Sequence, residues 1–489
     1  MKKKLVNSSQ IKLSKNIIGF VSLGCPKALV DTEKLINTIT RYGYQIANSY
    51  ELADLVVVNT CGFIESAVEE SFQAIAEALS VSNSVMVCGC LGVKADEIIN
   101  KFPQLKAIVG ANHDQIISAI LKLLPPSKQL PKREFLNANG GIKLTPPQYA
   151  YIKIAEGCNH KCSFCVIPKL RGKLISRSLK EIVSEAELLA QNGCQEIILI
   201  AQDLLAYGSD FKNGKNFQNL FLKLIDKLAE IGIWIRLHYL YPYPLVDHLI
   251  EKMAENKILP YLDIPLQHVS FRLLRSMKRP AFSYKQNMVD NHSQVLINQI
   301  NHWRKKLPEL TIRSSFIVGY PNEQESDFEE LLSFLVEAQL DRVGCFTYSP
   351  ISGAKANNII EQIPEQIKIE RQKRLMKVQE KISRSKLKKR VGKIYEVIVQ
   401  NIITNQKHKY IQARSYSESP NIDGDILIPL NNLNINLKNI NKGDHFQVRI
   451  TNSSTHDLEA EIIRELPRFN PNAQISKPSR ISSISVVTA

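Results

Sequence analysis

Apolar, β-branched runs alternate with helix-compatible segments over residues 16–125. Runs of this length predict buried strands, and the helical segments between them are the crossovers that parallel strands require. We therefore expect an open α/β domain built on a parallel sheet. Three of the runs read "NIIGFVSLGC", "DLVVVNTC" and "SVMVCGC".

The same alternation returns over residues 148–366, after a Pro-, Gly- and Asn-rich stretch at 126–147 that is typical of a linker between domains. Six βα units predict a barrel, or an open part of one, with its chemistry at the carboxyl ends of the strands. The six runs lie at residues 149–155, 196–203, 233–240, 261–268, 311–321 and 342–349.

Residues 391–466 show a different pattern, in which four short runs are separated by Asn, Gly and Asp. This favours a small all-β barrel, a fold often used to dock RNA or protein. Residues 367–390 read as a helical connector, with Leu375, Met376 and Ile382 on its buried side. The four runs lie at residues 393–400, 425–430, 445–453 and 457–463.

Composition is that of a soluble protein of two to four domains, with 489 residues of which 44% are hydrophobic and 22% charged. No apolar window is long enough to span a membrane, and the N-terminal residues lack the apolar segment of a secretory signal. Nine cysteines without such a signal favour a reducing compartment, which we expect to be the cytoplasm. The Ser-, Pro- and Asn-rich tail at 467–489 is expected to be disordered.

The net charge of +16 indicates nucleic acid or the ribosome as a partner. Residues 367–390 hold eleven Lys or Arg and two Glu, a net charge of +9, whereas residues 391–466 have a net charge of −1. More than half of the excess positive charge therefore lies in the connector at residues 367–390. It is either a solvated helix face or a surface that contacts ribosomal RNA, and the sequence favours neither.

Three cysteines, Cys158, Cys162 and Cys165, directly follow the first strand of the second domain, and no fourth lies nearby. A closed structural zinc site has four ligands, and ferredoxin-type clusters use four cysteines in other spacings. Three thiolates therefore predict a metal centre with one open coordination position.

The N-terminal domain offers a second set of three thiols, each at the end of a strand run. Because the carboxyl ends of parallel strands meet at one edge of a sheet, we expect these thiols to lie together. The set consists of Cys25, Cys61 and Cys90. The remaining cysteines, Cys88, Cys194 and Cys345, are interpreted as packing residues.

Polar residues end the other strands of the second domain. We expect the two histidines among them to be hydrogen-bonded residues at the barrel mouth. The set comprises Gln202, Asp203, His238, Gln267 and His268.

The Cys-x₃-Cys-x₂-Cys spacing after the first strand of a βα barrel resembles the radical S-adenosylmethionine (SAM) enzymes. In that superfamily three thiolates hold a [4Fe–4S] cluster whose fourth iron binds SAM. Phe164, the aromatic residue before the third cysteine, fits the pattern, and the resemblance implies Phe164 and Gln202 as SAM contacts.

Further motifs resemble the methylthiotransferase family, and "SLGCPKALVD" resembles its RimO branch. The resemblance implies a flavodoxin-like N-terminal domain with an auxiliary [4Fe–4S] cluster on Cys25, Cys61 and Cys90, a partial (βα)₆ radical-SAM barrel and a C-terminal TRAM β-barrel. The other motifs are "VVVNTCGFIESA", "VCGCLG", "LIAQDLLAYG", "YLDIPLQH" and "FIVGYPNE".

This resemblance implies methylthiolation of the β-carbon of an aspartate in the twelfth protein of the small ribosomal subunit. An external electron donor such as flavodoxin or ferredoxin would reduce the cluster. The alternatives are methylthiolation of a transfer-RNA adenosine and a non-enzymatic iron–sulfur protein that binds ribosomes.

Three positions depart from the family pattern. Asn322 stands where Gly is expected after "GYP", Ala28 replaces the usual Asn, and residues 283–295 are expanded. None of them is an expected cluster ligand, but Asn322 raises a question about the backbone of its loop.

Overall fold

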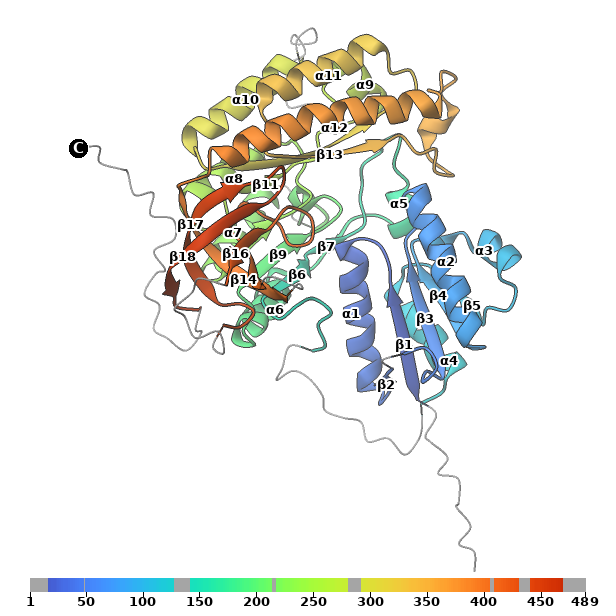
Figure 1. The fold of residues 1–489 in the computed structure, drawn as a ribbon. Coiled ribbons are helices and arrows are strands. Elements are labelled where there is room, and N and C mark those ends of the chain that lie inside the picture. Colours follow the sequence, from blue (N-terminus) through green and yellow to red (C-terminus); the bar gives the residue numbers. More distant parts are fainter. Residues whose placement is uncertain are drawn as a thin grey trace, which may run out of the picture. The chain divides into compact units, whose positions relative to one another are not determined.

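The computed structural model describes residues 16–47, 49–126, 141–212, 217–279, 292–404, 409–430 and 440–468. The chain forms two compact units, Met1–Ile142 and Lys143–Ala489 (Figure 1). Among the described residues, no helix is both long and apolar enough to cross a membrane.

The first unit is a five-stranded parallel sheet in the order β2-β1-β3-β4-β5, which is the flavodoxin-like order. The expected α/β domain is therefore confirmed. Its strands are β1 (Ile17–Ser22), β2 (Gln45–Ile46), β3 (Leu55–Thr60), β4 (Val85–Gly89) and β5 (Ala107–Ile108). Its helices are α1 (Pro26–Arg41), α2 (Glu65–Val81), α3 (Ala95–Lys101) and α4 (His113–Leu123), with the short η1 (Leu91–Val93).

Both faces of this sheet are covered, and side chains alternate between the two faces. Leu55 and Val57 of β3 pack with α1 and α4, whereas Val56 and Val58 pack with α2 and α3. Every residue of β3 and β4 is buried. This explains why both strands read as continuous apolar runs rather than alternating ones.

The second unit begins with a six-stranded parallel sheet in the order β13-β12-β11-β10-β9-β6. Its two outer strands, β6 and β13, do not pair with each other, so the sheet is the expected partial (βα)₆ barrel. Each of the six predicted runs contains one strand: β6 (Tyr149–Lys153), β9 (Glu196–Ile200), β10 (Trp234–Leu237), β11 (Tyr261–Asp263), β12 (Thr311–Val318) and β13 (Arg342–Thr347).

Helices follow the strands and share a large apolar core with their outer face. They are α6 (Leu179–Gln191), α7 (Phe217–Ala229), α8 (Leu245–Ala254), α10 (His292–Lys306) and α11 (Glu325–Ala338). The shorter helix α9 (Phe271–Ser276) packs instead in a separate apolar cluster with Tyr320 and Tyr348. Shorter elements are β7 (Ala155–Glu156), α5 (Ile167–Arg171), β8 (Ile175–Ser176), η2 (Leu204–Ala206) and η5 (Lys355–Asn358).

A closed β-barrel follows, and it has five strands rather than the four expected. The missed strand is β15, whose sequence "KYIQAR" buries Ile411 and Ala413 but shows too few apolar residues to stand out. Its pairing with β14 and β16 makes it a strand. The strands are β14 (Ile394–Thr404), β15 (Lys409–Arg414), β16 (Ile426–Pro429), β17 (His445–Ser453) and β18 (Leu458–Leu466).

The predicted connector is a helix, α12 (Glu365–Lys388), that packs on α11 and β13. Leu375 and Ile382 are buried as expected, but Met376 is exposed. One residue is a 100° rotation, which turns Met376 away from the side occupied by its neighbour Leu375. The expectation for Met376 was therefore wrong, and Arg371 is buried on the packed side instead.

Parts of three predicted segments lie outside the described residues. They are 127–140 of the linker, 283–291 of the expanded stretch and 469–489 of the tail.

Candidate metal centres

The three N-terminal cysteines follow three neighbouring strands of the first sheet. Cys25 precedes the first turn of α1 shortly after β1, Cys61 directly follows β3, and Cys90 directly follows β4. Because β1, β3 and β4 are adjacent and parallel, these positions share one edge of the sheet, as the sequence predicted.

Glycines allow the cysteine-bearing loops to press against one another. A Cβ atom on Gly24 would lie 2.9 Å from the Cβ of Cys61 and 3.1 Å from its sulfur. A Cβ on Gly62 would lie 3.0 Å from the nitrogen of Leu91 and 3.2 Å from the carbonyl carbon of Cys90. The three loops therefore form one close-packed cradle whose soft donors are thiols, a donor type that suits iron–sulfur clusters.

The structure separates Cys88 from Cys90. Cys88 lies within β4 and is fully buried in the core beneath α1 and α4. Cys90 lies beyond the strand and its backbone has turned to a helical conformation (φ −64°, ψ −39°) at the start of η1. This turn brings Cys90 to the sheet edge, whereas Cys88 packs in the core, as do Cys194 and Cys345.

The second triplet lies between β7 and α5, and each of its sulfurs has one hydrogen-bonding neighbour. The His160 amide donates to Cys158 Sγ and the Ile167 amide to Cys165 Sγ, each at 3.5 Å. The Tyr241 hydroxyl lies 3.1 Å from Cys162 Sγ. Two amide donors and one hydroxyl within hydrogen-bonding distance of the three sulfurs fit thiolates that carry negative charge.

Two thiols of this triplet are held in their neutral form by their surroundings. Burial, together with a smaller effect of the neighbouring thiols, raises the pKa of Cys158 to about 11 and that of Cys165 to about 12. Arg279 opposes the rise at both positions. Thiols of this kind ionise when a metal replaces their protons.

Among the described residues, no three Cys, His, Asp or Glu side chains converge on a position that could hold a single metal ion. In a [4Fe–4S] cluster each thiolate binds its own iron, so the three sulfurs need not meet at one point.

The two SAM candidates lie in different surroundings. Phe164 is half-buried and packs against the apolar cluster that includes Tyr320 and Tyr348. The Gln202 side chain donates a hydrogen bond to Glu156. Contact with SAM remains a prediction for both residues.

Two basic neighbours keep the Glu156 carboxyl group ionised. Burial alone would raise its pKa, but Lys153 and Arg171 hold the pKa of the Glu156 carboxyl below its usual value. Gln202 therefore adds a hydrogen bond to a half-buried carboxylate, a role that the motif comparison did not indicate.

Strained backbone marks the carboxyl edge of the second sheet. Tyr239, Gln267 and Asn322 have φ angles of 62°, 73° and 64°, and they follow β10, β11 and β12. Non-glycine residues in this region cluster at functional sites. For Asn322 the angle also explains why Gly was expected there, and Asn is among the side chains that tolerate it best.

The two histidines are hydrogen-bonded, as expected. His268 Nε2 lies 3.2 Å from a carboxylate oxygen of Glu323 at the barrel mouth. His238 Nε2 lies 3.0 Å from Ser419 Oγ, so its partner comes from the C-terminal β-barrel.

The turn after β15 closes the opposite side of the sheet. It contacts the first residues of three strands: Arg414 pairs with Glu196, Asn421 donates to the Tyr149 hydroxyl at 2.7 Å, and Asp423 accepts from Tyr261 at 2.7 Å. These three contacts cover the amino ends of the strands, and Ser419 of the same turn also reaches His238 just after β10.

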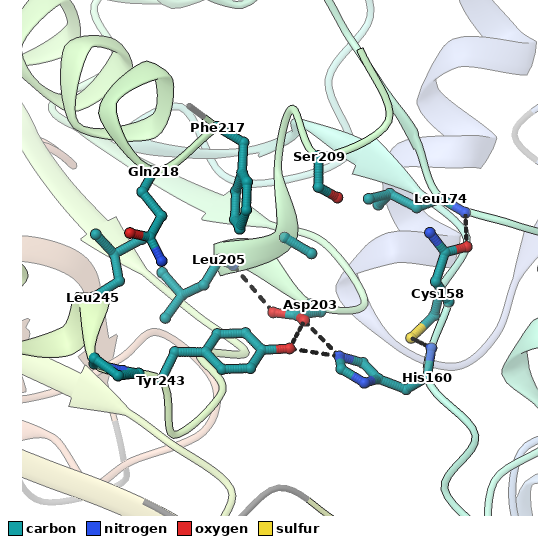
Figure 2. Close-up of a pocket in the computed structure, with 13 residues that line it drawn as sticks. Cys158, His160, Leu174, Asp203, Leu205, Ser209, Phe217, Gln218, Tyr243 and Leu245 are labelled. Atoms are coloured by element: carbon teal, nitrogen blue, oxygen red, sulfur yellow. Dashed lines mark hydrogen bonds and ion pairs between the residues drawn. The ribbon is translucent and has the colours of Figure 1, made fainter. Parts of the chain in front are cut away.

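A cavity of about 500 Å³ reaches the cysteine motif, with Cys158 in its wall (Figure 2). His160 Nε2 lies 2.7 Å from Asp203 and 2.8 Å from the Tyr243 hydroxyl, which donates to the same carboxylate at 2.9 Å. The sequence analysis did not single out His160, Tyr241 or Tyr243. The "YPYP" stretch at 241–244 was the signal available, but nothing in it indicates contact with a cysteine 79 residues away.

Three stretches of the chain match known families. Residues 18–110 match Uncharacterized protein family UPF0004, residues 152–335 match the Radical SAM superfamily, and residues 391–463 match the TRAM domain. The stretches lie within the three expected domains, whose exact boundaries remain predictions.

Close relatives cover nearly the whole chain. "Ribosomal protein uS12 methylthiotransferase RimO" of Acinetobacter baumannii is 47% identical over 455 residues, which is 91% of this chain and 98% of that protein. The protein of the same name in Psychrobacter arcticus is 47% identical over 456 residues, covering 91% and 83%. A distant solved structure is the radical SAM methyltransferase TsrM from Kitasatospora setae, with 13% identity, a TM-score of 0.47 and coverage of 69% and 77%. Identity at this level over nine-tenths of the chain shows that it belongs to the RimO family of radical SAM methylthiotransferases.

Proposed function

We propose that this protein transfers a methylthio group to the β-carbon of an aspartate in ribosomal protein uS12, giving 3-methylthioaspartate. The observation that carries the proposal is the alignment with RimO proteins over 91% of the chain, which includes all three matched domains. By name these relatives act on uS12, which favours this substrate over a transfer-RNA adenosine.

The cofactors of this enzyme are SAM and [4Fe–4S] clusters. We assign the radical SAM cluster to Cys158, Cys162 and Cys165. The auxiliary cluster is assigned to the edge that carries Cys25, Cys61 and Cys90. When bound, the cofactors supply the radical that removes hydrogen from an unactivated carbon and the methylated sulfur that replaces it.

The chain's own residues hold and shield these groups. The three sulfurs of the second triplet each face a hydrogen-bonding neighbour, and Arg279 adds positive charge beside them. Cys158 and Cys162 are at most 9% exposed, so little water reaches them. Exclusion of water protects a radical reaction from competing chemistry.

The enzyme also needs partners. An external one-electron donor, a flavodoxin or ferredoxin, reduces the radical SAM cluster. Acting on a ribosomal protein places the enzyme in the cytoplasm.

We further propose that α12 contacts ribosomal RNA near the target protein. Five exposed basic residues repeat at helical spacing and so share one side of α12, opposite its packed side. Within the described part of the chain, none of the four lysines among them forms an ion pair, and the stripe extends for about 22 Å. The residues are Lys373, Lys377, Lys381, Arg384 and Lys388.

Replacing the four lysines of the stripe by Gln tests this contact. The affinity for small-subunit RNA should fall, and the slope of log K against log salt should decrease by about 0.7–0.9 for each lysine that contacts a phosphate. The matched control replaces four exposed lysines on α7 and α10, namely Lys223, Lys227, Lys305 and Lys306. Equal losses in both variants would refute a specific role for α12.

The proposed function is tested by offering both substrates to the anaerobically reconstituted protein with SAM and a reductant. We expect 5′-deoxyadenosine and a mass gain of about 46 Da on uS12, the difference when a methylthio group replaces one hydrogen. Absence of 5′-deoxyadenosine would favour a non-enzymatic iron–sulfur protein. The same gain on transfer RNA alone would refute the assigned substrate.

A further inference from the structure

Tyr241 joins the cysteine motif to the hydrogen-bonded group beside it. It follows β10, is 7% exposed, and its hydroxyl lies 3.1 Å from Cys162 Sγ. Among the described residues, no other side chain forms a hydrogen bond to a sulfur of this triplet, because the contacts to Cys158 and Cys165 come from backbone amides.

The Tyr241 ring is clamped on both faces. The His160 ring stacks on one face at a centroid distance of 4.2 Å and an interplanar angle of 5°. The Arg279 guanidinium lies 3.7 Å from the ring centroid. His160 is itself held by Asp203 and Tyr243 at 2.7 and 2.8 Å. A ring held in this way keeps its hydroxyl directed at one sulfur.

The direction of the hydrogen bond follows from the ligand's charge. A thiolate that binds iron has no proton to donate, so the phenol must be the donor. Hydrogen bonds to the sulfurs of an iron–sulfur cluster help to set its reduction potential, because they stabilise the more negative, reduced state. One hydroxyl aimed at Cys162 therefore makes the cluster easier to reduce.

We propose that Tyr241 is a positioning residue that raises the reduction potential of the radical SAM cluster by donating a hydrogen bond to Cys162. The inference rests on the cluster assignment in the proposed function. It goes beyond that assignment, because it names the side chain that controls how readily the external donor reduces the cluster.

Tyr243 provides a matched control. It lies two residues from Tyr241, and their ring centroids are 5.5 Å apart. Its hydroxyl contacts Asp203 and His160, and within the described part of the chain no hydrogen bond joins it to the triplet. Tyr→Phe at either position removes one oxygen and keeps the ring, but only Tyr241→Phe removes the donor to Cys162.

The experiment is a redox titration of the reconstituted full-length protein, followed by the EPR signal that changes when SAM is added. Iron content is measured first. In Tyr241→Phe we expect unchanged iron and a lower midpoint potential. At fixed potential, the ratio of reduced to oxidised cluster should fall on the order of tenfold, which corresponds to about 59 mV for one electron. Tyr243→Phe keeps the contact between His160 and Asp203 that supports the Tyr241 ring, so it should keep the wild-type potential.

Each other outcome contradicts the inference. An unchanged potential in Tyr241→Phe, or the same shift in both variants, would refute a specific bond to Cys162. Loss of iron in Tyr241→Phe alone would assign the hydroxyl to cluster retention instead of tuning. A wild-type protein without any SAM-responsive signal would refute the cluster assignment itself, and this result is distinguishable because it does not involve a variant.

Discussion

Asn322 shows how a single residue can satisfy a backbone position that normally requires glycine. Its φ angle of 64° lies in the left-handed region, where Asn carries a smaller cost than branched side chains. The loop around it is hydrogen-bonded, since its amide donates to the Glu361 carbonyl at 2.7 Å and its carbonyl accepts from Arg272. Asn322 therefore keeps the backbone conformation of the loop although it departs from the family pattern.

We predict that Asn322→Val destabilises the second unit by about 1–2 kcal/mol, because a β-branched side chain is strained in the left-handed region. Asn322→Gly is the control and should keep the wild-type stability within about 0.5 kcal/mol. Urea unfolding followed by tryptophan fluorescence measures this, because both tryptophans, Trp234 and Trp303, lie in this unit. Equal stability of the Val and Gly variants would contradict the assigned conformation.

We predict that Cys88 and Cys90 differ in function although they are two residues apart. Cys88→Ala should keep the iron content and cost about 1–2 kcal/mol of stability, because a buried thiol leaves the core of β4. Cys90→Ala should lose the auxiliary cluster. Iron analysis after reconstitution decides between them, and the reverse pattern would mean that Cys88 is the ligand.

At the residue scale, the sequence predicted those site residues that lie close together in one short motif. The three cysteines of the second triplet lie within eight residues, so their spacing alone suggested an open metal site. Tyr241 contacts the same triplet from 79 residues beyond Cys162, and Arg279, which is 117 residues beyond Cys162, lies over the Tyr241 ring. Contacts over such separations depend on how strands are ordered in the sheet, and no short motif reports them.

At the element scale, the ends of parallel strands bring the expected ligands together. The strand order β1-β3-β4 makes neighbours of three cysteines spread over 66 positions of the chain. The prediction succeeded because the alternation of strands and helices implies parallel pairing. Strand β15 was missed because its two buried residues, Ile411 and Ala413, give too weak a pattern, and only pairing with its neighbours identifies it.

We predict about eight irons per chain after anaerobic reconstitution, four for each cluster. Replacing Cys158, Cys162 and Cys165 together by Ala should halve the iron and abolish SAM cleavage. Replacing Cys25, Cys61 and Cys90 should halve the iron but leave some formation of 5′-deoxyadenosine. Full iron in either triple variant would contradict the ligand assignment.

Glu418 links three elements of the second unit through its buried carboxylate. It pairs with Arg390 just after α12 at 2.5 Å and with Arg342 of β13 at 3.4 Å. Burial would raise its pKa, but Arg390 and Arg342 hold the pKa of Glu418 at about 2. Because an unfolded glutamate has a pKa of about 4.3, this stabilisation is complete above that pH and is lost as the pH falls through about 2.

Glu418→Gln should therefore lower the free energy of unfolding by about 3–5 kcal/mol near pH 7, because it leaves two buried guanidiniums without their anion. The difference from wild type should shrink between about pH 4.3 and pH 2. Glu461→Gln is the control, since its pair with Arg449 is more than half exposed on both sides and should contribute under about 1 kcal/mol. A pH-independent difference for Glu418→Gln would contradict the ion-pair account.

At the scale of the whole molecule, charge counted along the sequence differs from charge presented at the surface. The connector counts +9, yet Arg371, Arg374 and Lys386 pair with carboxylates of the βα barrel. Likewise, Glu418 is buried against the barrel and does not contribute to the surface of the C-terminal domain. The exposed stripe of α12 is the part left for the proposed RNA contact, and only the packing of α12 in the fold reveals it.

The central claim is tested most directly in cells, by mass spectrometry of small-subunit ribosomal proteins with and without this chain. We expect uS12 to be heavier by about 46 Da on one aspartate in cells that contain the chain, and to lack this added mass in cells without it. We also expect that restoring the chain with Cys158, Cys162 and Cys165 replaced by Ala does not restore the added mass. A uS12 of identical mass in both strains, with a methylthio group missing from transfer RNA instead, would contradict the account.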